Sequence, residues 1–212
     1  MGPHDDQPIV EGGTALAEAT AGGVLVHGRG ATATSILQLG DEVHSDGMAF
    51  FAPQAARNTW YPNSFLAAID SNEPGITSGL ERVDVAVSRL REAGIPRERI
   101  MLLGFSQGAC LASEYLARHA DRYGGLVALS GGVIGPDGTP RDYEGTLDGT
   151  PVFLGCSDRD PHIPLERVEE TVDVFEALDG DVDKRIYEGM GHTVNADELA
   201  YIRDLVGRLT AE

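Results

Sequence analysis

Short apolar runs alternate along this chain with longer amphipathic stretches. Six segments predict β-strands because their apolar residues are bounded by turn residues; they lie at 23–27, 48–52, 100–105, 125–130, 151–155 and 184–188. Continuous apolar character, as in the third and fourth of these, is typical of strands covered on both faces. A weaker pattern at residues 7–10 and 16–19 predicts an N-terminal hairpin.

Helical periodicity fills the gaps between the predicted strands. Residues 79–93 carry an apolar stripe ended by Gly94, and a second helix over 106–119 follows its strand almost without a loop. Two further helices are predicted at 165–178, behind Pro164, and at 196–209, behind an Asn195 cap.

This alternation predicts an α/β fold over residues 1–212 as one domain, with a mostly parallel central sheet, helices on both faces and no large cap. The least regular long segments are 57–78 and 131–150. Loops of this length inside a compact domain tend to be functional.

Charge is the unusual feature of the composition. The chain has 34 acidic and 16 basic residues, a net charge of −18, and Lys184 is its single lysine. Such a field repels nucleic acid and anionic membranes, so neither is expected as a partner. The chain is either an ordinary acidic protein or one adapted to a high-salt cytoplasm, and the near-absence of lysine beside fifteen arginines favours the halophilic interpretation.

The high-salt interpretation predicts that molar KCl raises the unfolding temperature. At 1 M salt the Debye length is about 3 Å, which suppresses repulsion between the surface carboxylates. Thermal unfolding followed by circular dichroism between dilute buffer and molar KCl measures the effect. A protein that is most stable in dilute buffer contradicts this interpretation.

The remaining composition points to a cytoplasmic protein. The N-terminus shows no basic region followed by an apolar run, so no signal peptide is expected, and no apolar stretch is long enough for a bilayer. Cys110 and Cys156 form neither a disulfide framework nor a metal-ligand pair, which favours a reducing compartment.

Residues 104–108 read G-F-S-Q-G between the best apolar strand and an amphipathic helix. In a sharp strand-to-helix turn the central residue is strained, and the flanking glycines leave room for the turn. This arrangement predicts Ser106 as a nucleophile raised above the carboxyl edge of the sheet, as in the α/β-hydrolase fold.

A serine nucleophile needs a base, and in this fold the order is serine, acid, histidine. His192, just past the last predicted strand, lies where a loop can carry an imidazole over the sheet edge. His119 is expected to interact with the last carbonyls of its helix instead. His27 is expected to be structural because it precedes Ser106.

The acid is expected in the loop S-D-R-D-P-H-I-P, where spacing alone leaves Asp158 and Asp160 equal and assigns the rejected one to bracing the turn. The same D-x-D-x-H run, ending at His162, could alternatively bind a metal ion. No further ligand is evident in the sequence, so no metal is expected.

Two backbone N–H groups are predicted to bind the oxyanion that forms in acyl transfer: those of Gln107, after the nucleophile, and Arg29, in the glycine-rich loop H-G-R-G-A-T. A phosphate-binding loop is the weaker alternative, since no G-x-x-x-x-G-K-S/T follows. Trp60 and Tyr61, in segment 57–78, either line a substrate pocket or cover the core, and both are candidate substrate-binding residues.

The blocks H-G-R-G-A-T, G-F-S-Q-G-A, S-D-R-D-P-H-I-P and G-M-G-H-T occur in this order. Together they resemble the phospholipase/carboxylesterase family of α/β-hydrolases, which includes acyl-protein thioesterases and bacterial carboxylesterases. The resemblance runs from about residue 23 to the C-terminus and implies that the aspartate of the D-P-x-V/I-P element, Asp160, is the acid. It also supports Ser106 and His192 and places the second oxyanion donor at Arg29.

The resemblance further implies an enzyme without metal or organic cofactor, acting on a small-molecule ester or thioester and often forming a homodimer. Arg29 and Ala31 depart from the eukaryotic thioesterases, which typically have an apolar residue and an aspartate there, so a prokaryotic enzyme for short-to-medium acyl esters is favoured over protein depalmitoylation. The rivals are a ring-opening esterase related to dienelactone hydrolase, whose usual nucleophile is cysteine, and a non-catalytic ligand-binding member of the fold.

Overall fold

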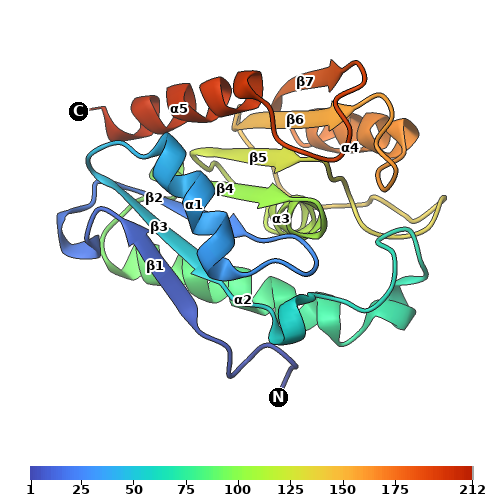
Figure 1. The fold of residues 1–212 in the computed structure, drawn as a ribbon, viewed down its shortest axis with the longest axis horizontal. Coiled ribbons are helices and arrows are strands. Elements are labelled where there is room, and N and C mark those ends of the chain that lie inside the picture. The colour runs from blue at the N-terminus through green and yellow to red at the C-terminus, as the bar shows by residue number, and fades with distance from the viewer. Residues whose placement is uncertain (212) are drawn as a thin grey trace.

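A seven-stranded sheet forms the centre of the computed structural model, which describes residues 1–211 (Figure 1). The strands lie in the order β1-β3-β2-β4-β5-β6-β7; β2 to β7 run parallel and β1 pairs antiparallel with β3 at one edge. Their bounds are Ile9–Gly13 (β1), Ala21–Val26 (β2), Met48–Pro53 (β3), Ile100–Phe105 (β4), Gly125–Leu129 (β5), Pro151–Ser157 (β6) and Asp181–Tyr187 (β7). All six predicted strands are confirmed, as is the mostly parallel α/β architecture.

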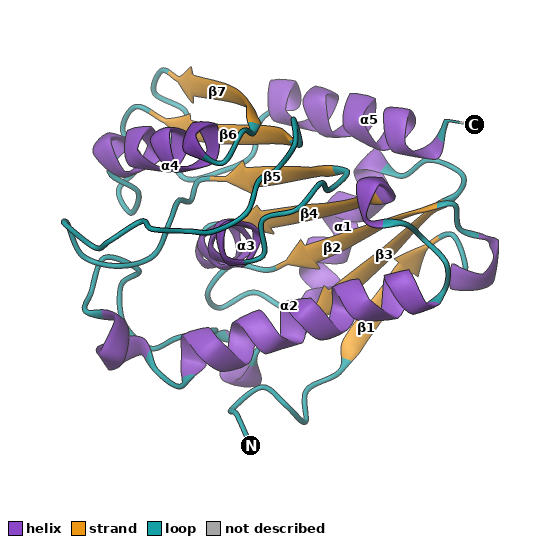
Figure 2. Ribbon diagram, turned by 180° about the vertical axis from the view of Figure 1, so that it is seen from behind, coloured by secondary structure: helices purple, strands orange, loops and turns teal. Residues whose placement is uncertain are grey.

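Helices cover both faces of this sheet, and the two views from opposite sides show the layers (Figures 1 and 2). On one face lie α1 (Ala33–Val43) and α5 (Ala196–Thr210); on the other lie α2 (Gly75–Glu92), α3 (Gln107–Arg118) and α4 (Leu165–Ala177). Alternate strand residues serve the two layers, so that Leu25 packs under α1 and Val24 on the opposite face. No helix within residues 1–211 is long and apolar enough to cross a membrane.

Two local predictions are wrong, and one helix is missed. The N-terminal hairpin is absent. Strand β1 pairs antiparallel with β3 instead, and Leu16–Glu18 forms a 3₁₀ turn. Helix α1 was not predicted; Thr32 begins it with a capping box, and its buried face includes Ile36 and Leu37. Helix α2 starts at Gly75 rather than at residue 79, so segment 57–78 is shorter as a loop than expected.

The topology brings several loops to one edge of the sheet. Strand β2 has β3 on one side and β4 on the other, so the chain reverses its direction of winding between β2 and β4. Ligands of open α/β sheets bind at such a switch point, outside the carboxyl ends of the strands. The loops after β2, β4, β6 and β7 meet at this edge because these strands are parallel.

Helix α5 contains a buried carboxylate that should make stability depend on pH. Asn195 caps the helix as predicted, and Glu198 returns a hydrogen bond by accepting from the Asn195 N–H at 2.9 Å. The other oxygen of Glu198 has no hydrogen-bond partner among residues 1–211. Burial raises the pKa of Glu198 from 4.5 to about 7.

Because the folded state holds this proton more tightly than the unfolded chain does, the free energy of unfolding falls as pH rises from 4.5 to about 7. Glu198→Gln keeps an acceptor for the cap and should reduce that fall by about 2–3 kcal/mol. Urea unfolding of wild type and variant at pH 5 and pH 8 measures it, with exposed Glu92→Gln as the control. If the free energies of unfolding of wild type and variant differed by the same amount at both pH values, the raised pKa of Glu198 would be contradicted.

Candidate active site

Ser106 occupies the turn between β4 and α3 in a strained conformation. Its φ of 55° and ψ of −120° lie where residues other than glycine are rarely found, at a cost of about 1–3 kcal/mol. A Cβ atom on Gly104 would lie 2.3 Å from the Gly108 carbonyl oxygen, and one on Gly108 would lie 2.0 Å from the Val26 carbonyl oxygen. Only glycine at both positions lets β4 turn directly into α3 beside β2.

The Ser106 hydroxyl lies at one end of a chain of hydrogen bonds. Its Oγ is 2.9 Å from Nε2 of His192, and Nδ1 of His192 is 2.7 Å from Oδ2 of Asp160. An ionised carboxylate can only accept, so Nδ1 carries the proton and Nε2 is free to accept from the serine hydroxyl. The structure thus brings together three side chains that lie far apart in the sequence.

The Asp160 carboxylate is fully buried and held from several directions. Besides His192, its Oδ1 accepts hydrogen bonds from the backbone N–H groups of His162, at 2.8 Å, and Ile163, at 3.1 Å. Burial raises the pKa of Asp160, but these three donors outweigh burial, so the pKa lies below its ordinary value. The carboxylate is therefore fixed in position and ionised at neutral pH.

Asp158 has a different task in the same loop. It accepts a hydrogen bond from the Gly189 N–H at 2.7 Å, and Ser157 Oγ accepts one from the Gly191 N–H at 3.2 Å. Gly189 and Gly191 have positive φ angles of 67° and 78°, which give the loop its turns. Asp158 therefore braces the loop that carries His192, as expected for the aspartate not chosen as the acid.

Arg29 and Gln107, whose backbone N–H groups are the predicted oxyanion donors, both line the cavity in front of Ser106. Within residues 1–211 neither of them donates a hydrogen bond to another protein group. Gly30, with φ of 77°, lets the loop after β2 turn here. Two unpaired backbone donors on residues that line the same cavity as Ser106 are suited to stabilise negative charge on a bound oxygen atom.

The side chains of the same two residues have a role that the sequence did not reveal. The Arg29 guanidinium donates to the carbonyl oxygens of Tyr61, Pro62 and Asn63 at 2.6–3.0 Å. The Gln107 amide accepts from the Trp60 N–H and donates to the Tyr61 carbonyl, both at 2.9 Å. Both side chains therefore hold the loop over residues 60–63 against the site. These contacts join loops more than 30 residues apart and have no sequence signal.

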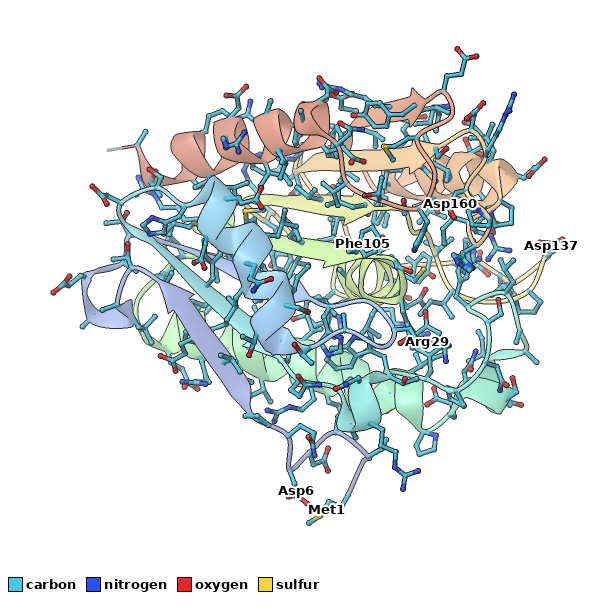
Figure 3. All side chains as sticks on the ribbon, viewed as in Figure 1. Met1, Asp6, Arg29, Phe105, Asp137 and Asp160 are labelled. Atoms are coloured by element: carbon cyan, nitrogen blue, oxygen red, sulfur yellow. The ribbon has the colours of Figure 1, made fainter. Side chains whose placement is uncertain are left out.

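Two cavities border Phe105 and His192. The first, about 490 Å³, is lined by Ser106 and by Tyr61, Phe65, Phe105, His162 and Ile163 among others. The second, about 380 Å³, shares Phe105 and His192 with the first and adds the apolar side chains of Ile36, Leu39 and Val194. Figure 3 shows Phe105, Asp160 and Arg29 at the same end of the sheet, where β2, β4 and β6 end.

Trp60 does not line either of these cavities, contrary to the expectation of a substrate-binding role. It is fully buried, and its indole N–H donates to the His27 carbonyl oxygen at 2.8 Å. A large amphipathic ring with a buried polar partner is better placed in the core than at a binding surface. Tyr61 does line the first cavity, and its role in substrate binding stays a prediction.

His27 and His119 make local structural contacts away from Ser106. His27 is buried and accepts a hydrogen bond from the Ala55 N–H at 3.1 Å, while His119 Nδ1 lies 2.9 Å from the Tyr115 carbonyl oxygen near the end of α3. Within the described part of the chain, no three His, Cys, Asp or Glu side chains are grouped as metal ligands.

The comparisons with known proteins agree on one family. The model of the phospholipase/carboxylesterase family matches residues 9–208. The chain is 26% identical over 207 residues to acyl-protein thioesterase 1 of Yarrowia lipolytica, covering 89% of this chain and 91% of that protein. It is similar to the crystal structure of a phospholipase/carboxylesterase from Dyadobacter fermentans, with a TM-score of 0.91 and 39% identity over 97% and 98% of the two chains. The Bacillus cereus carboxylesterase, 19% identical over 97% and 95% of the chains, shares the fold with a TM-score of 0.73.

Proposed function

Because the chain belongs to the phospholipase/carboxylesterase family of α/β-hydrolases and is thus a carboxylic ester hydrolase, we propose that it is a serine carboxylesterase using Ser106, His192 and Asp160. One observation carries this proposal: the hydroxyl, imidazole and carboxylate form a continuous hydrogen-bonded chain at a strained turn. A serine hydroxyl activated by a positioned base is the nucleophile of acyl transfer.

In the proposed first step, Ser106 Oγ attacks the acyl carbon while its proton passes to Nε2 of His192. The Asp160 carboxylate holds the imidazole in the required tautomer and stabilises the imidazolium that forms. The negative charge on the former carbonyl oxygen is bound by the Arg29 and Gln107 N–H groups, and one such donor lowers the barrier by about 3 kcal/mol. His192 then returns the proton to the leaving group as the bond to the acyl carbon breaks.

In the second step a water molecule replaces the leaving group. His192 takes a proton from the water as its oxygen attacks the acyl carbon, and then gives the proton to Ser106 as the acid departs. At the end of the second step Ser106, His192 and Asp160 have the charges with which they started. The proposed reaction therefore requires no cofactor. The two adjoining cavities support short-to-medium acyl esters as substrates, and the same chemistry serves thioesters, as the name of the Yarrowia relative indicates for that protein.

The cysteine nucleophile of the ring-opening rival finds no support. Cys110 and Cys156 are both buried, and burial raises the pKa of each thiol to about 12. The thiolate, which is the reactive form, would therefore be scarce at neutral pH.

Covalent labelling by a fluorophosphonate tests the proposal. We expect one stoichiometric modification, located at Ser106 by peptide mass spectrometry, because only an activated serine attacks the phosphorus atom. His192→Ala should slow the labelling by about 100-fold or more, since it removes the base. Absence of labelling in the folded wild type, or labelling confined to another serine, would contradict the proposal and favour a non-catalytic binding protein.

A further inference from the structure

The first cavity beside Ser106 differs in charge from the rest of this molecule. None of the fifteen residues that line it is an aspartate or a glutamate, in a chain that has 34 acidic residues and a net charge of −18. The lining includes instead one arginine and two histidines. A cleft with a charge unlike that of its surroundings concentrates ligands of the opposite sign.

Arg29 supplies a positive charge that no carboxylate neutralises. Its guanidinium donates only to the backbone carbonyls of Tyr61, Pro62 and Asn63, and it forms no ion pair within residues 1–211. Arg167 lies over the ring of Phe65, another residue that lines the cavity, but the charge of Arg167 is paired with Asp137 and Glu170. Arg29 therefore brings a positive charge without an acidic partner to the lining of the cavity.

His162 supplies a hydrogen-bond donor that the proposed mechanism does not use. Its backbone N–H is tied to Asp160, which fixes the residue in the acid's own loop, while its imidazole is exposed and lines the cavity. The ring lies 4.8 Å from that of His192, at an interplanar angle of 78°. No protein group within the described residues hydrogen-bonds to its ring nitrogens. An imidazole keeps at least one N–H donor in either protonation state.

From these observations, and resting on the proposed esterase function, we propose that the enzyme selects esters that carry a carboxylate. The carboxylate lies in the first cavity, where His162 donates a hydrogen bond to it and Arg29 provides the positive potential. The neutral remainder of the ester extends into the second cavity, whose walls include Ile36, Leu39 and Val194. His162 is thus a specificity-determining residue beside the reacting groups.

The carboxylate could belong to the acyl part or to the leaving group, and two matched substrate pairs separate these sources. Mono-4-nitrophenyl adipate is compared with 4-nitrophenyl heptanoate, and 4-carboxyphenyl butyrate with 4-carbamoylphenyl butyrate. For each pair the ratio of kcat/KM, anionic over neutral, is measured in wild type, His162→Leu and His162→Glu. A general loss of activity cancels in this ratio, so a merely structural role of His162 would not change it.

In at least one pair we expect His162→Leu to lower the ratio about tenfold, because it removes a charge-assisted hydrogen bond. His162→Glu should lower it about 100-fold, because it also places a negative charge beside the substrate carboxylate. Arg159→Gln is the matched control. Arg159 is exposed on the same loop and does not line the cavity, so its replacement removes a charge without touching the site and should change the ratio by less than about twofold.

Two outcomes would overturn the inference while leaving the proposed function standing. In the first, all four esters are hydrolysed but both His162 variants keep the wild-type ratio in both pairs. In the second, Arg159→Gln lowers the ratio as much as His162→Leu does, which would assign the effect to the general field of the molecule. If wild type hydrolyses none of the four esters, the proposed function falls and the inference with it.

Discussion

Replacement of Ser106 by alanine is expected to lower kcat for 4-nitrophenyl butyrate by about 10⁴- to 10⁶-fold, because the nucleophile itself is removed. The residual rate would reflect binding and the two oxyanion donors, which the substitution leaves in place. Initial rates followed by nitrophenolate release, with a stringent blank for spontaneous hydrolysis, measure the loss. The unfolding temperature should remain close to that of wild type, since alanine needs no more space in the turn.

Ser88→Ala is a suitable control for the Ser106 variant. Ser88 lies in helix α2, away from both cavities, and its replacement should leave the rate within about twofold of wild type. A Ser106→Ala enzyme that keeps more than about 1% of the wild-type turnover would contradict the nucleophile assignment. Such a result would indicate that another hydroxyl group of the cavity is the nucleophile.

The central fold could be predicted because its signals are local. The strand at β4, the glycines of G-F-S-Q-G and the following helix are adjacent in the sequence, and each imposes its geometry on the next. The errors concern segments whose structure depends on distant partners. Residues 16–19 look extended in isolation, but β1 gains more by completing the sheet edge along β3 than by pairing within a hairpin. The sequence pattern of helix α1 is weak, because a glycine-rich loop precedes it and Gly40 occupies a position on its buried face.

The candidate site divides in the same way. Fold order and spacing predicted which loops meet at the sheet edge, and the structure places Ser106, His192 and Asp160 within hydrogen-bond distance there. Their chemical roles stay predictions. Spacing could not separate Asp158 from Asp160, because the two lie on one turn and both face the loop after β7; the choice depends on which carboxylate reaches the His192 imidazole and which reaches the Gly189 N–H. Nor could it separate a pocket residue from a core residue at Trp60, since an aromatic side chain in a loop suits both.

Asp160→Asn is the second substitution with a large expected effect. Backbone N–H groups beside Asp160 fix the orientation of the new side-chain amide. Oδ1 of Asp160 accepts from the His162 and Ile163 N–H groups. An asparagine must keep its oxygen on these two donors, so its NH₂ group faces Nδ1 of His192. The imidazole must then accept at Nδ1 and carry its proton on Nε2, where it can no longer take the proton of Ser106.

This wrong tautomer is expected to lower kcat for 4-nitrophenyl butyrate by about 10³- to 10⁴-fold at neutral pH, while KM changes little. Asp158→Asn is the matched control: it makes the same chemical change two residues away and keeps an oxygen to accept from the Gly189 N–H. It should cost less than about tenfold, because the loop carrying His192 stays braced. If the two variants lost activity equally, or if Asp158→Asn lost more, the assignment of Asp160 as the residue that orients His192 would be wrong.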